Sequence, residues 1–520
     1  MDSEEFRQFA GASIEFIINY LENIRERPVL TSVEPGYLHK VLPTETPQKP
    51  DKWQDILKDM ENIILPGIVH WQSPQFSAYF PAGQSYASIV GELLSAGLAV
   101  IGFNWITSPA CTELEVAMMN WLGKLLDLPE EFLNSSEGPG GGIIQGSASE
   151  ASLVGMLAAK QRTVRRIKET DPTMDEAVIK GKLVAYASNQ SNSSVEKTGL
   201  LGSVPVRLLG VDKNCSLRGE TLLQAVQEDI KKGFIPCYLV ATFGTTGTCA
   251  FDNIEELAEV CQKYNIWLHI DAAYAGAALV CPEYRHLMKG IDKSDSFNFN
   301  LHKWLLVNFD CSAMWVKNSN YLVDTFNVDR IYLEHHHNQH SQNSMAPDYR
   351  HWQIPLGRRF RALKLWTTLR LYGVEGLQNS IRKDIRLAEL FASYVRSDER
   401  FEVIPEPSMA LVCFRLKGDD EFTKQLLNKI VERKKLYMVP ATYESFYIIR
   451  YVVCSRLTTE KDIEFAWNEI QSQANEILQS PSQISSNTFV QKTSNMDINT
   501  KESFKISNNY HPNNITEKSQ

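Results

Sequence analysis

The chain has 520 residues, of which 43% are hydrophobic and 22% are charged. This ordinary globular composition excludes a wholly disordered, collagen-like or coiled-coil protein, and the length predicts about three or four average domains or fewer large ones. The net charge of −9 argues against binding to nucleic acid or to anionic membranes, because both need a basic surface.

Residues 1–80 are expected to form a helical segment that packs on a partner subunit. Apolar residues recur at helical spacing over residues 4–24, and a second helix is expected near Trp53–Leu65. A proline-rich stretch separates the two helices. Such a segment is poorly suited to folding alone, so it is expected to wrap over another surface.

Residues 81–380 alternate short apolar strands with amphipathic helices. The strand candidates are Leu183–Ala187, Tyr238–Thr242, Ile266–Ile270 and Ala313–Val316, and helices are expected over 85–98, 112–126, 149–168, 219–232 and 253–264. This alternation predicts one large domain with a mainly parallel sheet covered by helices on both faces. Parallel sheets place ligand groups at the carboxyl ends of their strands, so the chemistry is expected there.

The C-terminal part is expected to hold a smaller α/β domain over residues 381–478, ending in a helix near Glu460–Leu478. Residues 479–520 are rich in Ser, Asn, Thr, Gln and Lys and poor in apolar residues. This composition predicts a disordered tail.

The nine cysteines predict a reducing compartment. Their number is odd, none of them forms a C-x-x-C pair, and most lie in apolar surroundings. This pattern is neither a disulfide framework nor a zinc ribbon. The first residues contain no basic-then-apolar run, and no stretch reaches the roughly 18 uncharged apolar residues of a membrane span. The cytoplasm is therefore the expected location.

Three short motifs, taken together, indicate a pyridoxal-phosphate (PLP) enzyme. Asp271 is expected at the end of a buried strand, where a carboxylate can face the pyridinium nitrogen of PLP and keep it protonated. Lys303, about thirty residues later, supplies an amine that can hold the aldehyde as a Schiff base. The run Gly146-Ser147-Ala148-Ser149-Glu150 precedes a helix whose first N–H groups can bind the phosphate. Each motif alone has a plainer interpretation: a helix cap, a surface lysine and a loop, respectively.

Two other motifs receive plainer interpretations. The run Gly138-Pro139-Gly140-Gly141-Gly142 is not a Walker motif, because no Gly-Lys-Ser/Thr follows, and it is expected to be a flexible turn before a strand at 143–145. Four histidines, His335, His336, His337 and His340, could bind a metal ion. The chemistry needs none, so a solvated loop is favoured and no metal is predicted.

The order and content of the motifs resemble the group II PLP-dependent decarboxylases, in particular the aromatic-L-amino-acid decarboxylase family. The resemblance covers residues 1–478 and rests on four specific motifs. These are Ser108–Glu115 (SPACTELE), Asp271–Tyr274 (DAAY), Asn300–Trp304 (NLHKW) and His351–Arg359 (HWQIPLGRR). The family implies the α/β fold of PLP-dependent fold type I, which is aspartate aminotransferase-like, and an obligate homodimer with active sites at the subunit interface.

The resemblance also implies roles for individual residues. Lys303 would bind PLP covalently, and Asp271 would pair with the pyridinium nitrogen. Four residues would hold the phosphate: Ala148, Ser149, Asn300 and His302. Three more would belong to the cofactor surroundings: Thr246, Asp252 and Ala273. The aromatic-substrate pocket would be lined by Tyr79, Phe80, Ala82, Ile101 and Phe103, and Tyr332, on a loop over about 328–342, would deliver a proton to the substrate carbon.

Two residues depart from the family pattern. Decarboxylases of this family carry a His at the position of Asn192, and that imidazole stacks on the cofactor ring and helps to position the protonation machinery. Asn has neither an aromatic face nor a titration near neutral pH. Protonation of the substrate carbon is therefore expected to slow, which leaves an electron-rich state that O2 can oxidise. Ala82 stands where related decarboxylases commonly carry Thr, which leaves the choice among dopa, tyrosine and other aromatic acids open.

The leading hypothesis is a homodimeric PLP enzyme that couples decarboxylation to oxidative deamination of an aromatic L-amino acid, with dopa as the expected substrate. O2 would be the co-substrate, and the products would be an aromatic acetaldehyde, CO2, ammonia and hydrogen peroxide. Asn192 together with Tyr332 resembles the insect aromatic acetaldehyde synthases. Two alternatives stay open: a simple decarboxylase that releases the amine, and a cofactor-binding protein without turnover. Intact Lys303, Asp271 and Tyr332 argue against the second alternative.

Overall fold

Seven strands form the central sheet of the described residues. The computed structural model describes residues 1–328 and 346–479. In order across the sheet, the strands are β1 (Gly141–Gln145), β7 (Ser312–Val316), β6 (Ser296–Asn300), β5 (Trp267–Asp271), β4 (Ile235–Thr242), β2 (Leu183–Ser188) and β3 (Val206–Leu209). β7 runs antiparallel to β1 and β6, and the other neighbours are parallel. The predicted mainly parallel sheet is confirmed, and so are the four predicted strands.

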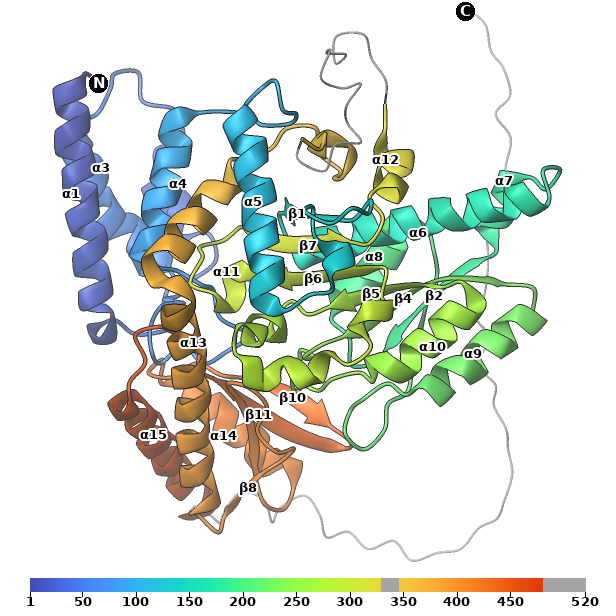
Figure 1. Ribbon diagram of the computed structural model, residues 1–520. Helices are drawn as coiled ribbons and strands as arrows, with labels where there is room; N and C mark the ends of the chain where they lie inside the picture. Colours follow the sequence, from blue (N-terminus) through green and yellow to red (C-terminus); the bar gives the residue numbers. More distant parts are fainter. Residues whose placement is uncertain (329–345, 480–520) are drawn as a thin grey trace, which may run out of the picture.

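Helices cover both faces of this sheet. Figure 1 shows α6 (Ala148–Thr170) on one side of β2, β4 and β5, and α9 (Gly219–Lys231) and α10 (Ile254–Tyr264) on the other. The other helices of this region are α4 (Tyr86–Leu98), α5 (Pro109–Leu126), α7 (Glu176–Gly181), α8 (Ser193–Gly202), α11 (Leu301–Trp304) and α12 (Asn320–Phe326). The five predicted helices are confirmed with small shifts at their ends, whereas the shorter helices α7, α8, α11 and α12 were missed.

The sheet separates two hydrophobic layers. In β2, Leu183, Ala185 and Ala187 pack into one layer with residues of α6 and α8. Val184 and Tyr186, which alternate with them, pack into the other layer. Because side chains alternate between the two faces of a strand, both faces must be covered when every residue is apolar. This is why the buried strands are continuous apolar runs in the sequence.

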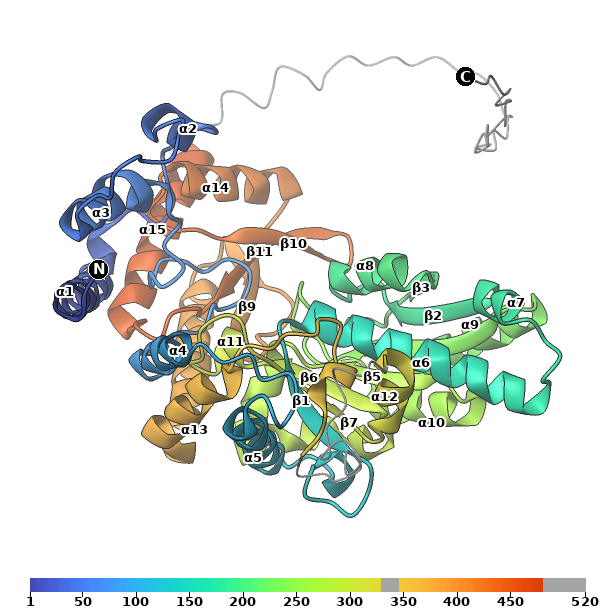
Figure 2. The same ribbon diagram turned by 90° about the horizontal axis from the view of Figure 1, so that it is seen from above.

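A second sheet, of four antiparallel strands, lies in the C-terminal part of the described chain (Figure 2). Its order is β10 (Val439–Tyr443), β11 (Phe446–Val452), β9 (Leu411–Leu416) and β8 (Phe401–Val403), with α14 (Asp420–Glu432) and α15 (Glu460–Gln479) packed nearby. The element α13 (Arg361–Arg396), whose helix is interrupted by a kink at Gly373, extends from α4 to this sheet and passes through residue 381, where a domain boundary is predicted. Both sheets contribute to one continuous buried cluster.

The N-terminal segment lies at the outer edge of the molecule (Figure 2). It contains α1 (Ser3–Glu22), α2 (Tyr37–Val41) and α3 (Trp53–Asp59). α1 packs on α3 but leaves Phe6 and Ile14 exposed. The segment also contacts the C-terminal part of its own chain, where Arg25 pairs with Asp462 at 2.9 Å. Its packing on a partner subunit stays a prediction.

The glycine run at 138–142 enters the packed interior at Gly140, whereas Gly138 and Pro139 are exposed. Gly141 and Gly142 begin β1 and are buried. A Cβ on Gly141 would lie 2.6 Å from Asn134 Nδ2, and one on Gly142 would lie 2.6 Å from Met119 Cε. The prediction of a flexible turn before a strand at 143–145 is therefore wrong at these two positions. The strand begins earlier, and the glycines allow α5 to approach it closely.

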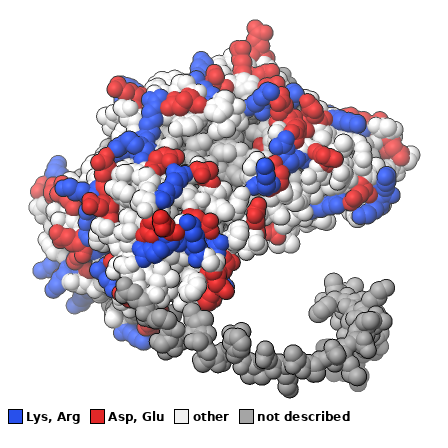
Figure 3. All heavy atoms as spheres, turned by 90° about the horizontal axis from the view of Figure 1, so that it is seen from below, with Lys and Arg blue, Asp and Glu red and all other residues white. Residues whose placement is uncertain are grey.

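The surface carries mixed charge. On the face shown in Figure 3, Lys and Arg side chains are interspersed with Asp and Glu side chains. None of the helices in residues 1–328 and 346–479 combines the length and the apolar composition that a membrane span requires.

Candidate active site

Polar side chains gather where the parallel strands end. β4 ends at Thr242, β5 at Asp271 and β6 at Asn300. Thr242 lies opposite Asp271 in the β4–β5 ladder. Because the three strands are parallel neighbours, these three residues meet at one edge of the sheet. All three line a cavity that also contains Lys303.

Lys303 lines two cavities formed by the described residues. The smaller, of about 150 Å³, is lined by the three strand ends and by Ala148 and Ser149 at the start of α6. The larger, of about 720 Å³, is lined mainly by apolar and aromatic side chains. Four residues line both cavities: Phe80, Asn192, Thr246 and Lys303. This arrangement suits a polar cofactor in the smaller space and a substrate side chain in the larger one.

The amine of Lys303 lies in surroundings that favour its neutral form. Burial lowers the pKa of Lys303, the Asp271 carboxylate opposes this shift, and the charge of Arg450 adds to it. The Lys303 Nζ lies 5.6 Å from the centre of the Phe80 ring. A lysine with a lowered pKa loses its proton more readily and can then attack an aldehyde. The predicted role of Lys303 requires such surroundings.

Asp271 ends β5 with its carboxylate enclosed. Its Oδ1 accepts a hydrogen bond from the Ala273 backbone N–H at 3.0 Å. Burial raises the pKa of Asp271, while Lys303 and the Ala273 N–H act against this rise. A buried carboxylate gains most from a cationic partner, and a pyridinium N–H is such a partner.

The part of the smaller cavity next to α6 fits a phosphate group. Ser147 caps α6 by accepting a hydrogen bond from the Glu150 N–H at 3.2 Å, so the positive end of this helix lies at Ala148 and Ser149. Three buried atoms of residues in the lining have no hydrogen-bond partner within residues 1–328 and 346–479: Thr242 Oγ1, the Tyr274 hydroxyl oxygen and Asn300 Oδ1. Buried polar atoms are rarely left so, and a polar ligand would satisfy them. The residues present therefore fit PLP.

His302 lines the larger cavity. Its Nδ1 accepts a hydrogen bond from the Cys311 backbone N–H at 2.9 Å, so the neutral ring carries its proton on Nε2. Burial, and then the charge of Lys303, lower the pKa of His302 to about 4. At neutral pH the ring is uncharged and offers one N–H donor.

This lowered pKa predicts that His302 makes an acid-labile contribution to stability. The folded state, with a pKa of about 4, binds fewer protons than the unfolded state, whose ordinary value is 6.5. The contribution is therefore present above pH 6.5 and is lost as the pH falls through about 4. Between pH 7 and pH 4, the free energy of unfolding should fall by about 3 kcal/mol less in His302→Gln than in the wild type. Urea unfolding at both pH values measures this difference, and equal losses would contradict the prediction.

Asn192 is held between the two cavities by both ends of its amide. It is the N-cap of α8, and its Oδ1 accepts a hydrogen bond from the Ser194 N–H at 3.0 Å. Its Nδ2 donates to Thr246 Oγ1 at 2.9 Å. Although α8 was missed, an Asn before a periodic apolar run is a typical signal of a helix start.

Aromatic side chains line the larger cavity. Phe80 stacks on Tyr274 with ring centres 3.8 Å apart, and Tyr79 stacks on Trp71. Trp71 lines the cavity and was missed by the prediction from sequence. Ala82 also lines it and brings no hydroxyl to the wall. Flat apolar walls of this kind favour an aromatic ligand.

Ile101 and Phe103 do not line either of the cavities that contain Lys303 within this chain. Ile101 is 60% exposed and borders a separate cavity of about 410 Å³. The Phe103 carbonyl accepts a hydrogen bond from the Arg350 N–H. A sequence pattern cannot tell which subunit's site a residue serves, so the role of these two residues stays a prediction for a site built from two chains.

Asp252 does not line either cavity. Its carboxylate accepts hydrogen bonds from the backbone N–H groups of Thr242 at 2.7 Å and Leu217 at 2.8 Å. Burial raises the pKa of Asp252 to about 7, against the effect of these two hydrogen bonds. Asp252 therefore supports the end of β4 from outside the cavity, whereas Ala273 lies in the lining of the smaller cavity.

Arg450, in the middle of β11, is a buried residue of the larger cavity that was missed. Its guanidinium carbon lies 5.1 Å from the centre of the Phe80 ring. It donates hydrogen bonds to the carbonyls of Gly247 and Tyr79, both at 2.9 Å. Tyr79 has a φ of 58°, in the left-handed region, and Arg450 helps to hold it there. A single arginine inside the apolar run FYIIRYV is the signal that could have found it.

Tyr332 and the four histidines at 335, 336, 337 and 340 lie outside the described residues. The roles predicted for them stay predictions. In the part of the chain that the structure describes, no group of three or more His, Cys, Asp or Glu side chains could hold a metal ion.

Comparisons with known proteins agree with this geometry. Residues 35–417 match the family model described as the pyridoxal-dependent decarboxylase conserved domain. The chain is 55% identical over 478 residues to a 3,4-dihydroxyphenylacetaldehyde synthase of Aedes aegypti, covering 92% of this chain and 91% of that protein. It is 55% identical over 471 residues to an aromatic-L-amino-acid decarboxylase of Manduca sexta, covering 91% of this chain and 92% of that protein.

A solved structure extends the agreement to the fold. The crystal structure of Oryza sativa TDC with PLP and tryptamine matches with a TM-score of 0.88 at 34% identity, covering 92% of this chain and 99% of that one. The predicted α/β architecture of fold type I and the predicted dependence on PLP are confirmed. The chain belongs to the pyridoxal-dependent decarboxylase family.

Proposed function

We propose that this protein is an aromatic acetaldehyde synthase that couples decarboxylation of an aromatic L-amino acid, foremost L-dopa, to its oxidative deamination. The observation that carries the proposal is Asn192, which lines both cavities at the position where the resemblance places a decarboxylase His. Relatives named 3,4-dihydroxyphenylacetaldehyde synthase in Aedes aegypti and Drosophila melanogaster, each 55% identical, support it. The amino acid, O2 and water are converted to the aldehyde, CO2, ammonia and hydrogen peroxide, which balances all atoms.

The chain's own residues can bind and orient the reactants. PLP, when bound, supplies the electron sink for the loss of CO2. Lys303 would hold PLP covalently, and Asp271 would keep its ring nitrogen protonated. The start of α6 would bind its phosphate through Ala148 and Ser149. Phe80 and the other aromatic walls of the larger cavity would exclude water and orient the substrate ring.

Asn192 bears on what happens to the substrate carbon after CO2 has left. A proton must reach that carbon if an amine is to be released. The Asn192 amide does not titrate near neutral pH, and its two ends are already bonded to Ser194 and Thr246. It therefore cannot pass on a proton, and slow protonation leaves time for oxidation by O2.

The lining of the larger cavity supports an aromatic substrate over an acidic one. Ala82 offers no hydroxyl to a catechol. The Tyr79 hydroxyl is a nearby polar group of the same wall, and it pairs with the Tyr437 hydroxyl at 2.9 Å. Recognition of a catechol would therefore rely on the tyrosine hydroxyls.

A decarboxylase that releases the amine is the second candidate. Relatives named aromatic-L-amino-acid decarboxylase in Manduca sexta and Drosophila melanogaster are 55% and 53% identical, nearly the same as the synthases. Overall identity therefore does not separate the two activities. The two activities are separated by which residue stands at position 192 and by which product is formed.

Product analysis after incubation with L-dopa in air tests the proposal. We expect 3,4-dihydroxyphenylacetaldehyde and hydrogen peroxide in equal amounts, with little dopamine. Parallel incubations with L-tyrosine and L-glutamate test the substrate class, and glutamate should be inert. Dopamine as the main product, without peroxide, would establish the second candidate instead.

A homodimer is part of the proposal. α4 presents an uncovered apolar face made of Val90, Leu93, Leu94 and Leu98, each between 48% and 60% exposed. A contiguous apolar face of this kind is typical of a subunit interface. Ile101 follows it directly, so a second subunit on this face would cover Ile101 as well. This fits the predicted place of Ile101 in a site shared between subunits.

Leu94→Glu is expected to split the dimer, because it places a charge in the centre of this face. Sedimentation should give a mass of about twice 59.0 kDa for the wild type and 59.0 kDa for the variant. Leu200→Glu is the matched control, since Leu200 on α8 is 82% exposed and lies outside this face. A wild-type protein that sediments as a monomer would contradict the dimer.

A cytoplasmic location is also part of the proposal. All nine cysteines lie within the described ranges, and each is a buried free thiol. Burial raises the pKa of several of them, for example that of Cys237 to about 12, which keeps the thiol protonated and unreactive. Free thiols in this number are typical of proteins from a reducing compartment.

A further inference from the structure

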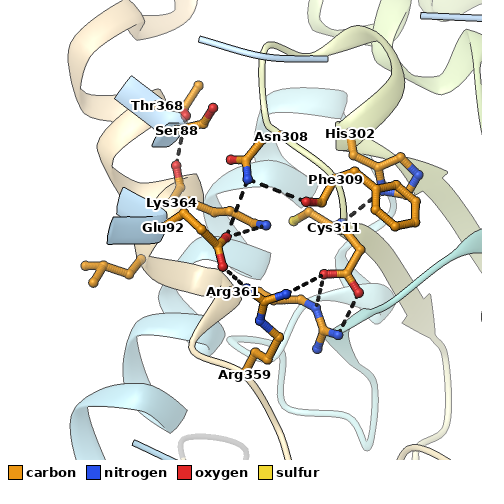
Figure 4. A network of polar contacts seen from close by, with 12 residues as sticks. Ser88, Glu92, His302, Asn308, Phe309, Cys311, Arg359, Arg361, Lys364 and Thr368 are labelled. Carbon is orange, nitrogen blue, oxygen red and sulfur yellow. Dashed lines mark hydrogen bonds and ion pairs between the residues drawn. The ribbon is translucent and has the colours of Figure 1, made fainter. Parts of the chain in front are cut away.

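Charged side chains form a network around residues 305–311, the loop between α11 and β7 (Figure 4). Both carboxylate oxygens of Asp310 accept hydrogen bonds from Arg361, at 3.2 and 2.9 Å. Arg359 approaches the same carboxylate at 3.7 Å. Burial by itself would raise the pKa of Asp310, but Arg361 and Lys364 hold it below its ordinary value. Asp310 and Arg361 therefore form an ionised, two-pronged pair at neutral pH.

The network is anchored on two helices that touch closely. Glu92 of α4 pairs with Lys364 of α13 at 2.8 Å, and it also pairs with Arg359. A Cβ on Gly91 would lie 2.4 Å from the Lys364 Cα, so there is no space between the helices here. Because α13 begins at Arg361, the packed start of this helix gives Asp310 a rigid support.

The loop in turn holds the ring of His302. The Cys311 backbone N–H donates to His302 Nδ1 at 2.9 Å, and the His302 backbone N–H donates to the Cys311 carbonyl at 3.2 Å. The Phe309 ring stands edge-on to the His302 ring, with centres 4.7 Å apart (Figure 4). Both chain neighbours of Asp310 therefore contact His302.

We propose that Asp310, held by Arg361, is a positioning residue for His302. Fixing residues 309 and 311 keeps His302 Nδ1 occupied, which leaves Nε2–H as the one donor of the ring. His302 lines the larger cavity, and its chain neighbour Lys303 lines both cavities, so this donor is available to a ligand that Lys303 holds where the two cavities meet. The inference rests on the proposed function, because the ligand that His302 serves is PLP.

Charge and geometry predict opposite effects when Asp310 is removed. A Cβ on Gly146, in the turn before α6, would lie 3.3 Å from Asp310 Oδ2, so the carboxylate is close to the proposed phosphate site. Loss of its negative charge alone would strengthen the binding of a phosphate dianion. Loss of the support for His302 would weaken the binding of the phosphate dianion. A fall in PLP affinity therefore reports the positioning role.

Titration of the apoenzyme with PLP, followed by tryptophan fluorescence, tests the inference. Asp310→Ala and His302→Gln are each expected to bind PLP about tenfold more weakly than the wild type. The double variant should match His302→Gln alone, because Asp310 acts through that ring. Asp324→Ala is the matched control: it removes another Arg–Asp pair, with Arg165 at 2.5 Å, and should bind PLP like the wild type.

Additive losses in the double variant, an unchanged or higher affinity in Asp310→Ala, or wild-type affinity in His302→Gln would each overturn the inference. If Asp310→Ala does not fold, Asp310→Asn replaces it in the same comparison of single and double variants. This substitution keeps the side-chain volume and one acceptor oxygen. A wild-type apoenzyme that takes up no PLP would instead overturn the proposed function. The two failures are thereby distinguishable.

Discussion

The Lys303→Ala variant is expected to lose covalently bound PLP and to turn over at least about 10³-fold more slowly, a barrier increase of about 4 kcal/mol. The physical reason is the loss of Lys303, the one amine of the described residues that lines both cavities, where burial lowers its pKa. PLP could still bind through its phosphate and ring, but it would not be attached. Borohydride reduction followed by mass spectrometry measures the attachment, and the steady-state rate with L-dopa measures the turnover.

Lys289→Ala is the matched control for this experiment. Lys289 is exposed and pairs with Glu255 at 2.9 Å, outside both cavities. This variant should keep both the covalent cofactor and the rate. Attachment of PLP to the Lys303→Ala protein after reduction would mean that another lysine binds the cofactor, and the assignment of the site would be wrong.

The Asn192→His variant is expected to move the product ratio toward the amine by about a hundredfold, which needs a change of only ~3 kcal/mol between two competing barriers. A histidine at this position can stack on a cofactor ring and titrates near neutral pH. The substrate carbon should therefore be protonated faster relative to its oxidation. The substitution also removes the side-chain cap of α8, at a cost of about 1 kcal/mol in stability. The ratio of amine to aldehyde is therefore the measurement, since it does not depend on the amount of active protein.

Asn189→His provides the control for residue 192. Asn189 is exposed, precedes α8 and does not line the cavities. It should leave the product ratio unchanged. If Asn192→His also leaves the ratio unchanged, another residue controls the choice between protonation and oxidation.

Much of the fold could be predicted because its strands are covered on both faces. β2 and β4 are continuous apolar runs, and such runs between amphipathic helices predict a parallel sheet. β6 was missed because its sequence, SFNFN, alternates Phe with polar residues that resemble a loop. The amide nitrogen of Asn298 has its partner inside the sheet, because Asn298 Nδ2 donates to Ser312 Oγ at 2.7 Å. Only the neighbouring strand reveals this partner.

Site residues could be predicted where the residues next to them in the chain form a recognisable motif. Asp271 ends the predicted strand β5, and Lys303 was recognised from the motif Asn300–Trp304 although β6 before it was missed. Arg450 could not be placed in this way, because it reaches the cavity from the other sheet through contacts with Tyr79 and Gly247. The predicted place of Asp252 in the cofactor surroundings stays a prediction. Its carboxylate accepts hydrogen bonds from two backbone N–H groups, and a sequence pattern does not show these partners.

The amount of O2 consumed for each CO2 released tests the central claim most directly. An oxygen electrode and CO2 trapping, applied to the same wild-type sample with L-dopa, provide both quantities. The account predicts as many molecules of O2 consumed as of CO2 released, with an equal amount of hydrogen peroxide formed. CO2 release with an equal amount of dopamine and no consumption of O2 would contradict it.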